Sequence, residues 1–432
     1  MRRRPLRRRH RHGSQVFPNM TGLVDGNNFF VSCERVFDRS LEGRPVAVLS
    51  SNDGCVVSRS NELKALGIPM GAPYFQLRPR ARSLGIEFRS GNFELYADMS
   101  RRLMETLGDL FGDIEQYSID EAFVFPPGGI DLLDFGRMAR AAVLRRIGIP
   151  CGIGFAPTKT LAKIANHIAK KTEGGVFIMP EDTREILGKI PVSEVWGVGR
   201  RLAPKLERDR ILTARDLAEC PGARLRKKYG VTLERTALEL AGKPCSGDSR
   251  GAGELSQSIA CSRCFGEPVG DFESLAQSVA YHLGRAAEKL REQGQRAGGA
   301  GAYFVYYPER SPRRLEGGVV SASVAFSRPT DDTSEMIKAV FPKLREIFIE
   351  GRRYKKSGAT LWGLESGAVQ GELFGPSPER SRLYSSVDEV NRKFGRGTLF
   401  PLAEGVDKKW RARRDMLSRA YTTSWDDIIS VR

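Results

Sequence analysis

Two adjacent carboxylates, Asp120 and Glu121, lie inside the apolar and aromatic segment YSIDEAFV at positions 117–124. Burial of one unpaired carboxylate is costly, and burial of two side by side costs more. A third acid, Asp25, follows a short apolar run and begins an Asp-Gly-Asn-Asn cluster that is typical of a tight turn. Each acid alone is commonly a turn former or a solvated side chain, so their meaning depends on whether the fold brings them together.

The predicted elements around these acids indicate a small mixed sheet with helices on one face, in a ferredoxin-like order. A short strand ends near Asp25. The sequence then predicts a long amphipathic helix at Phe93–Phe111 and two short strands around the acid pair at 114–125. A second helix is predicted at Leu132–Ile149, followed by a strand with its own helix at Cys151–Lys171. In this topology the Asp25 strand and the Asp120 strand can be neighbours, which would place three carboxylates around one point.

The chemistry of such a trio is that of a metal site. Successive side chains on a strand point to opposite faces, so Asp120 and Glu121 reach one cation only if the backbone bends, as at a strand end or bulge. Three mutually repelling carboxylates call for a divalent metal, and Mg²⁺ prefers oxygen ligands and is often shared with substrate phosphates. Two such ions about 3.5–4 Å apart activate a 3′-hydroxyl and stabilise a leaving pyrophosphate. The trio therefore predicts two Mg²⁺ ions and nucleotidyl transfer.

Basic side chains near the acids suit a phosphate-rich ligand. The segment Arg44–Asn52 predicts a buried strand, and Gly54–Ile68 predicts a turn and a helix that carries Arg59 and Lys64 five positions apart. These two could hold a triphosphate, although a helix surface is the default interpretation of each. Four further lysines lie on the predicted loop and helix close to the acids, at positions 159, 163, 170 and 171.

Two later segments suit a nucleic-acid backbone. Val195–Cys220 is typical of a helix-hairpin-helix, in which Gly197 and Gly199 let the backbone approach a phosphate and the following helix N-terminus presents free amides. Arg200 adds full charge, and such backbone contacts do not read bases. A plain glycine turn is the alternative.

From about Glu254 the pattern of strands and helices repeats as a second β-α-β-β-α-β unit. Its basic loop, which begins with Arg352 and Arg353, would suit a DNA backbone, although such runs are commonly just solvated.

Composition limits the possible classes of protein. A chain of 432 residues predicts two to four domains. Its net charge of +17 indicates a polyanion partner, most simply nucleic acid, with solubility alone as the bland alternative. No apolar run of about 18 residues exists, which argues against a membrane span. Seven scattered cysteines fit a reducing cytoplasm better than a disulfide framework.

Both ends of the chain differ from the rest. Residues 1–19 are arginine-rich and predict a basic disordered extension, either a phosphate-binding arm or an upstream extension of the reading frame before Met20. Without its seven arginines a net charge of about +10 remains. At 370–374, QGELF pairs a polar hook with apolar anchors, as in a docking peptide, with an ordinary loop as the alternative. The basic segment 381–432 is predicted to be poorly ordered or partner-dependent.

Together these motifs resemble a Y-family DNA polymerase. The resemblance is carried by LVDGNNFFVSCE, VLSSNDGCVVSRSNELKALGIPMG, NFELYADMS, YSIDEAF, PTKTLAKIANHIAKK and VWGVGRR, and it continues to GRGTLF and YTTSWDD near the C-terminus. It implies an α+β multidomain, right-hand polymerase with a ferredoxin-like palm, small fingers, a helical thumb with a helix-hairpin-helix, and a β-α-β-β-α-β little finger. The implied boundaries are palm 20–29 and 92–178, fingers 30–91, thumb 179–248, little finger 253–365, and a C-terminal extension at 366–432.

The resemblance also implies roles for individual residues. Asp25, Asp120 and Glu121 would be the catalytic, metal-binding acids, with the Gly26 carbonyl as a further ligand. Five residues after the first acid the family places an aromatic steric gate that rejects ribonucleotides, here Phe30. The other implied contacts are, for the nucleotide, Phe29, Arg59, Lys64 and Lys170; for DNA, Gly197, Gly199, Arg200, Arg352 and Arg353; and for a sliding clamp, Gln370, Leu373 and Phe374.

The implied function is error-prone translesion synthesis from dNTPs on primed and damaged DNA in the bacterial SOS response, in the cytoplasm and associated with the nucleoid. The implied partners are a processed UmuD-type dimer, a RecA filament and the sliding clamp, with no membrane. Two alternatives stay open from the residues alone. Another metal-dependent palm enzyme, such as a nucleotide cyclase, would not need the thumb or the second basic unit. A non-catalytic DNA-binding scaffold would not need three acids at one place.

Overall fold

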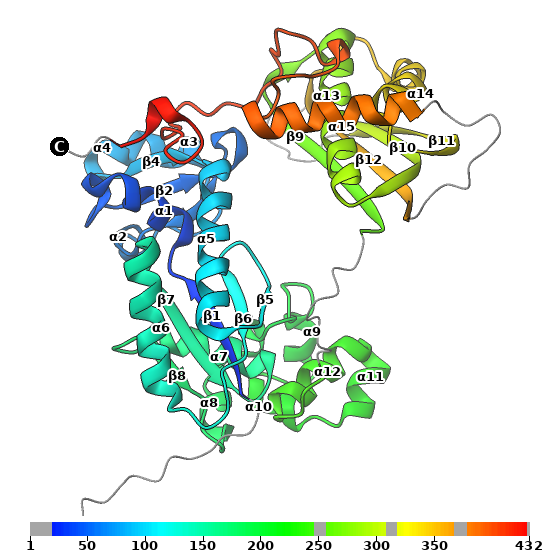
Figure 1. Ribbon diagram of the computed structural model, residues 1–432. Coiled ribbons are helices and arrows are strands. Elements are labelled where there is room, and N and C mark those ends of the chain that lie inside the picture. The colour runs from blue at the N-terminus through cyan, green and yellow to red at the C-terminus, as the bar shows by residue number, and fades with distance from the viewer. Residues whose placement is uncertain (1–19, 246–255, 308–317, 367–377, 430–432) are drawn as a thin grey trace, which may run out of the picture.

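The computed structural model describes residues 20–245, 256–307, 318–366 and 378–429, and Figure 1 shows their arrangement. These residues form three β-sheets with helices packed on them. In the described ranges, no helix is both long and apolar enough to cross a bilayer. Short 3₁₀ helices connect the larger elements at Arg39–Leu41, Ser51–Asp53, Arg78–Arg80, Val192–Glu194, Leu402–Glu404 and Trp425–Asp427.

The three acids belong to a five-stranded sheet, which we call the palm. Its strands, in spatial order, are β5 (Ile114–Gln116), β6 (Glu121–Val124), β1 (Thr21–Gly26), β7 (Cys151–Ala156) and β8 (Val176–Ile178). The central strand β1 runs antiparallel to both β6 and β7, and β7 runs parallel to β8. The ferredoxin-like prediction is confirmed, with β8 as an additional edge strand.

Helices cover both faces of the palm sheet. The helices α5 (Phe93–Phe111) and α6 (Leu132–Ile147) pack on the face that carries Val24, whereas α7 (Lys159–Ala169) packs on the face that carries Leu23. Strand alternation makes these two neighbours point to opposite faces. The prediction that the helices lie on one face was therefore wrong for α7.

Glycine in β7 determines how closely α7 approaches the sheet. A Cβ at Gly154 would lie 2.1 Å from the backbone nitrogen of Asn166, far inside van der Waals contact. The side-chain amide of Asn166 donates to the carbonyls of Leu23 and Gly152 at 3.0 and 2.8 Å, so the same helix fixes the spacing of β1 and β7.

Replacing Gly154 by alanine is expected to destabilise the palm, on the order of 1–3 kcal/mol, because the backbone of α7 has to move away from the sheet. Thermal unfolding of the purified full chain measures this as a lower melting temperature. Gly108→Ala is the matched control, because a Cβ at this helical position meets nothing within 4 Å. An unchanged melting temperature for Gly154→Ala would contradict the expected clash.

The fingers contain a small sheet, of which the sequence predicted only the buried strand within Arg44–Asn52. After α1 (Phe29–Phe37), the strands β3 (Val56–Arg59), β2 (Val46–Leu49) and β4 (Glu87–Ser90) lie side by side in that order. The segment that begins at Gly54 was predicted as a turn and a helix, but it forms β3 first, and the helix begins only at Asn61, with Ser60 accepting from Leu63 N–H at 3.2 Å. The short helices of the fingers are α2 (Asn61–Ala65), α3 (Tyr74–Leu77) and α4 (Ala81–Leu84).

Five short helices form the thumb, as predicted. They are α8 (Arg184–Gly188), α9 (Ala203–Arg208), α10 (Ala214–Glu219), α11 (Gly222–Tyr229) and α12 (Val231–Leu240). Their core is continuous with the α7 face of the palm, because apolar side chains of α7 and of the thumb helices belong to one buried cluster.

A separate α+β unit, the little finger, confirms the second β-α-β-β-α-β prediction. Its elements are β9 (Ser258–Val269), α13 (Phe272–Glu292), β10 (Gln295–Tyr306), β11 (Val319–Thr330), α14 (Thr333–Ile347) and β12 (Tyr354–Ser366). The strand order is β11-β10-β12-β9, and α14 continues through Pro342.

The described part of the C-terminal extension is folded onto the rest of the molecule. The helix α15 (Pro378–Phe394) lies along the little finger, and Arg291 of α13 forms an ion pair with Asp388 at 2.6 Å. Trp410 is only 3% exposed and packs against Tyr281. Residues 381–432 were predicted to be poorly ordered or partner-dependent, and the first of these alternatives is wrong for residues 381–429.

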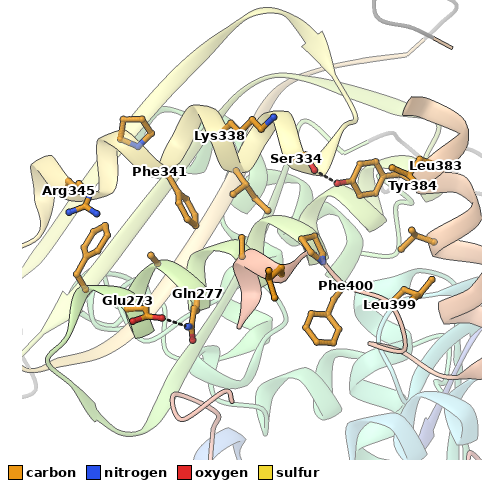
Figure 2. A pocket seen from close by; sticks show the side chains of 18 residues that line it. Glu273, Gln277, Ser334, Lys338, Phe341, Arg345, Leu383, Tyr384, Leu399 and Phe400 are labelled. Carbon is orange, nitrogen blue, oxygen red and sulfur yellow. Dashed lines mark hydrogen bonds between the residues drawn. The ribbon is translucent and has the colours of Figure 1, made fainter. Parts of the chain in front are cut away.

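An apolar groove lies where this extension meets the little finger, between α13, α14 and the start of α15 (Figure 2). Phe341, Leu383 and Phe400 point into it. None of the residues predicted to contact metal, nucleotide or DNA lines this groove, so it is separate from the carboxylate site.

Candidate active site

The fold brings the three acids to adjacent positions of the palm sheet. Asp25, near the end of β1, pairs directly across the ladder with Glu121, the first residue of β6. The N–H of Gly26 donates to the Asp120 carbonyl at 2.9 Å, so Asp120 lies beside the end of β1. Asp25 and the acid pair, which are distant from each other in the sequence, therefore share one edge of the site.

Asp120 lies in a bend before β6, so the rule that successive strand residues point to opposite faces does not separate it from Glu121. The Ser118 hydroxyl accepts from the N–H groups of Asp120 and Glu121 at 3.2 and 3.1 Å and donates to Asp120 Oδ1 at 2.7 Å. Asp120 therefore precedes the strand, which is the strand-end geometry that the sequence required. Ser118 was not singled out beforehand, although a serine two residues before an acid is a signal for such a local turn.

Two lysines of the α7 region neutralise the acids. Lys170 Nζ lies 2.6 Å from Asp25 Oδ2, and Lys163 Nζ lies 3.0 Å from Glu121 Oε2. Burial raises the pKa of Asp25 to about 7, a rise that Lys170 opposes and the adjacent Glu121 carboxyl increases. Burial also raises the pKa of Asp120, with the Ser118 hydrogen bond acting in the opposite direction. The site therefore disfavours uncompensated negative charge.

The donor chemistry of the trio fits a hard divalent cation, since carboxylate and carbonyl oxygens are what Mg²⁺ binds. Among the residues that the structure describes, no three His, Cys, Asp or Glu side chains form a ready-made metal-binding group. Two of the three acids are instead directed toward Lys163 and Lys170. Each lysine contacts one carboxylate oxygen, Oδ2 of Asp25 and Oε2 of Glu121.

Phe30 occupies the first turn of α1 and is half-buried. Its ring stacks on Tyr96 of α5, with centroids 4.5 Å apart and planes 14° from parallel. The neighbouring Phe29, also predicted to contact the nucleotide, is only 3% exposed and belongs to the palm core. Any nucleotide contact from Phe29 would therefore come from its backbone, because its side chain faces away from solvent.

The predicted triphosphate-binding cations lie close to one another. Lys64 Nζ donates to Asn28 Oδ1 at 2.6 Å. Burial lowers the pKa of Lys64, and the charges of Arg59 and Lys170 lower it further. Arg59 itself donates to the Ile68 carbonyl at 2.6 Å. Three cations thus lie within electrostatic reach beside the acids, as a phosphate-binding group requires.

The predicted DNA contacts fall in two separate parts of the molecule. In the thumb, Gly197 has φ of +87°, and the Gly199 carbonyl accepts from the first amides of the turn that leads into α9, with Arg200 exposed beside them. In the little finger, Arg353 is exposed before β12, and the Arg352 guanidinium lies 5.1 Å from the Tyr306 ring centre. The clamp peptide with Gln370, Leu373 and Phe374, and the extension at 1–19, lie outside the described residues.

A buried pair next to Phe30 was missed by the sequence reasoning. Tyr96 donates its hydroxyl to Glu34 Oε1 at 2.6 Å, and Glu34 is only 1% exposed. Burial raises the pKa of this carboxyl, with the Tyr96 hydrogen bond opposing the rise. Glu34 lies four residues after Phe30, so both occupy one face of α1. The sequence signal for this buried pair was an acidic residue among the apolar residues of a predicted helix.

Models of known protein families match most of this chain. The impB/mucB/samB family model matches residues 24–167, and the impB/mucB/samB family C-terminal domain matches 256–373. The IMS family HHH motif matches 180–208, in agreement with the predicted helix-hairpin-helix. A domain of unknown function, DUF4113, matches residues 381–431, which belong to the C-terminal extension.

Relatives match over almost their full length. Protein UmuC of Salmonella typhimurium is 43% identical over 96% of this chain and 100% of its own. Protein SamB of Salmonella typhimurium is 40% identical and protein MucB of Escherichia coli 37% identical, each over 95% of this chain and 99% of its own.

Solved structures show the same fold. A Y-family DNA polymerase chimera of Dbh and Dpo4 superposes with a TM-score of 0.62 at 22% identity, covering 81% of this chain and all of its own. The insertion ternary complex of Dbh DNA polymerase gives a TM-score of 0.50 at 20% identity, with the same coverage. The chain therefore has the fold of the Y-family DNA polymerases and belongs to the impB/mucB/samB family.

Proposed function

We propose that this chain is a template-directed DNA polymerase that performs error-prone translesion synthesis in the bacterial SOS response by two-metal nucleotidyl transfer. The single observation that carries the proposal is the direct pairing of Asp25 with Glu121, beside Asp120, in a palm of this family. Asp25, Asp120, Glu121 and the Gly26 carbonyl would hold two Mg²⁺ ions. When bound, these ions activate the primer 3′-hydroxyl and stabilise the departing pyrophosphate.

The other residues of the site bind and select the nucleotide. Lys170, Lys64 and Arg59 supply positive charge for the triphosphate, and Lys170 would leave Asp25 to contact it. Phe30, held against Tyr96, would occupy the space that a ribose 2′-hydroxyl needs. Sugar selection on this account is steric and independent of the base.

Two basic regions would hold the primed template. The Gly197 turn of the thumb, with a φ of +87° at Gly197, would let the backbone approach a phosphate. On the little finger, Lys355 and Lys356 lie 5.2 and 5.8 Å from the ring centres of Tyr307 and Tyr303. Positive charge alternating with aromatic rings suits a nucleic-acid backbone.

Partners complete the proposal. A processed UmuD-type dimer, a RecA filament and the sliding clamp are expected to act with this chain, in the cytoplasm at the nucleoid. The clamp would engage Gln370, Leu373 and Phe374.

A primer-extension assay tests the function. The full chain, together with these partners, a primed template, dNTPs and Mg²⁺, is expected to extend the primer, and to continue past a damaged template base. Chelation of Mg²⁺ by EDTA is expected to stop extension, and added Mg²⁺ to restore it. Binding of primed DNA without extension under all these conditions would instead support a non-catalytic scaffold.

A further inference from the structure

A segment of the C-terminal extension, Arg411–Tyr421, crosses from the little finger to the fingers and palm, and we call it the C-terminal strap. Figure 1 shows this red segment against the fingers, close to α3 and β4. It begins directly after Trp410, which is buried against Tyr281 of the little finger. It lies within residues 381–431, which match the domain of unknown function, and that family model assigns no role to it.

At its first end, the strap is attached to the little finger. The Arg411 carbonyl accepts from Gly266 N–H at 3.1 Å, and Arg413 forms an ion pair with Glu267 at 2.5 Å. Asn52 of the fingers joins this contact, because its side chain donates to the Phe265 carbonyl at 2.8 Å and accepts from Arg413 N–H at 2.9 Å. Strap, little finger and fingers therefore meet at one point.

At its second end, the strap contacts both helices that form the sugar gate. The Ser418 hydroxyl donates to Glu34 of α1 at 3.1 Å. Asn92, whose side chain caps α5 by accepting from Leu95 N–H at 3.2 Å, donates its amide to the Ser418 hydroxyl at 2.9 Å. Tyr421 stacks on the last residue of α1, Phe37, with centroids 4.8 Å apart.

We propose that Ser418 is a positioning residue for sugar discrimination, which acts on Phe30 through Glu34 and Tyr96. The Glu34 carboxylate oxygen that accepts from Ser418 is the same Oε1 that accepts from Tyr96 at 2.6 Å. The Tyr96 ring in turn supports the Phe30 ring by stacking. A shared acceptor in a buried site couples the two hydroxyls, because loss of one changes the geometry available to the other.

The consequence is a physical link between the C-terminal strap and the choice of sugar. Without the Ser418 hydroxyl, Glu34 loses one of its two hydroxyl partners and the cap of α5 loses a contact. Tyr96 is then held less firmly, and Phe30 excludes the ribose 2′-hydroxyl less well. Because the strap is also attached to the little finger, a change in the position of the little finger can be transmitted to Phe30 through Ser418, Glu34 and Tyr96.

The inference rests on the proposed role of Phe30 as the gate, and the test separates the two. Single-nucleotide incorporation by the full chain with its partners is measured with a dNTP and the matching rNTP, and the ratio of the two kcat/KM values is compared among variants. Ser418→Ala and Tyr96→Phe are each expected to lower the preference for dNTP by about three- to tenfold, the effect of one lost hydrogen bond. Tyr96→Phe removes only the hydroxyl and keeps the stacked ring.

Ser334→Ala is the matched control. It removes a serine hydroxyl that bonds Tyr384 of the extension at 2.5 Å, but on the little finger, away from the gate. Its dNTP preference should equal that of the wild type. In a Phe30→Ala background, Ser418→Ala should produce no further change in the ratio, whereas a merely destabilising substitution would lower incorporation of both nucleotides in either background.

Two negative outcomes are distinguishable. If Phe30→Ala raises ribonucleotide use while Ser418→Ala and Tyr96→Phe keep the wild-type ratio, the strap inference alone is overturned. If Phe30→Ala leaves the ratio unchanged, the gate assignment fails, and the strap inference fails with it, while the polymerase activity itself is untouched.

Discussion

Primer extension is expected to fall by about a hundred- to a thousandfold when Asp120 is replaced by asparagine, the loss typical of removing one essential electrostatic group. Asparagine keeps the shape of the side chain and an oxygen that can accept the 2.7 Å hydrogen bond from Ser118. The bend before β6 should therefore survive, and the change is confined to charge. A neutral amide holds Mg²⁺ much less well than a carboxylate, so the proposed activation of the 3′-hydroxyl should be lost.

DNA binding should change little in this variant. The groups proposed to hold the template lie in the thumb and the little finger, on different elements from Asp120. Fluorescence anisotropy with labelled primed DNA measures affinity, and the extension assay measures rate on the same preparation. Asp109→Asn is the matched control, because this exposed residue of α5 forms a surface ion pair with Arg146, and wild-type activity is expected. Wild-type extension by Asp120→Asn would refute its catalytic assignment.

Local patterns were enough to predict most elements around the site. The helix at Phe93–Phe111 was predicted with its observed bounds because its apolar stripe has helical periodicity. The meeting of Asp25 with the acid pair followed from the order of strands and helices, since few topologies accommodate that order. In these cases a periodicity or a topological rule carries the information.

Other features could not be predicted because their determinants are not local. The strand at Val56–Arg59 is too short for its period to be distinguished from a turn, and it is stabilised by pairing with β2. The helix α7 covers the second face of the palm only because Gly154 leaves room for its backbone. Which carboxylate oxygens Lys163 and Lys170 contact depends on side-chain geometry that spacing does not encode.

The C-terminal strap shows most clearly which contacts sequence patterns do not predict. Ser418 contacts Glu34 although the two residues are 384 positions apart. The strap residues form no regular helix or strand, so they leave no periodic signal, and a basic segment without periodicity is typical of disorder. Its order comes from pairing with the fingers, where Met416 N–H donates to the Ser90 hydroxyl at 3.0 Å.

Ribonucleotide incorporation is expected to rise by about ten- to a hundredfold relative to deoxyribonucleotide incorporation when Phe30 is replaced by alanine. That range is what removal of a steric contact of this size usually contributes to discrimination. The ring is held in place by stacking on Tyr96 at 4.5 Å and by an edge contact with Phe93 at 6.0 Å. A ring supported on two sides cannot move aside for a 2′-hydroxyl, whereas a methyl group leaves that space open.

The control variants separate sterics from stability. Phe30→Tyr keeps the ring and should keep the exclusion of ribonucleotides. Phe75→Ala removes a phenylalanine of the fingers that is 71% exposed, and it should change neither nucleotide. Loss of the half-buried Phe30 ring also weakens packing between α1 and α5, so some loss of dNTP incorporation is expected in Phe30→Ala. Only the ratio of ribonucleotide to deoxyribonucleotide incorporation isolates the gate, because weakened packing lowers both rates whereas an opened gate raises one relative to the other. A ratio equal to that of the wild type would place sugar selection on another residue of the site.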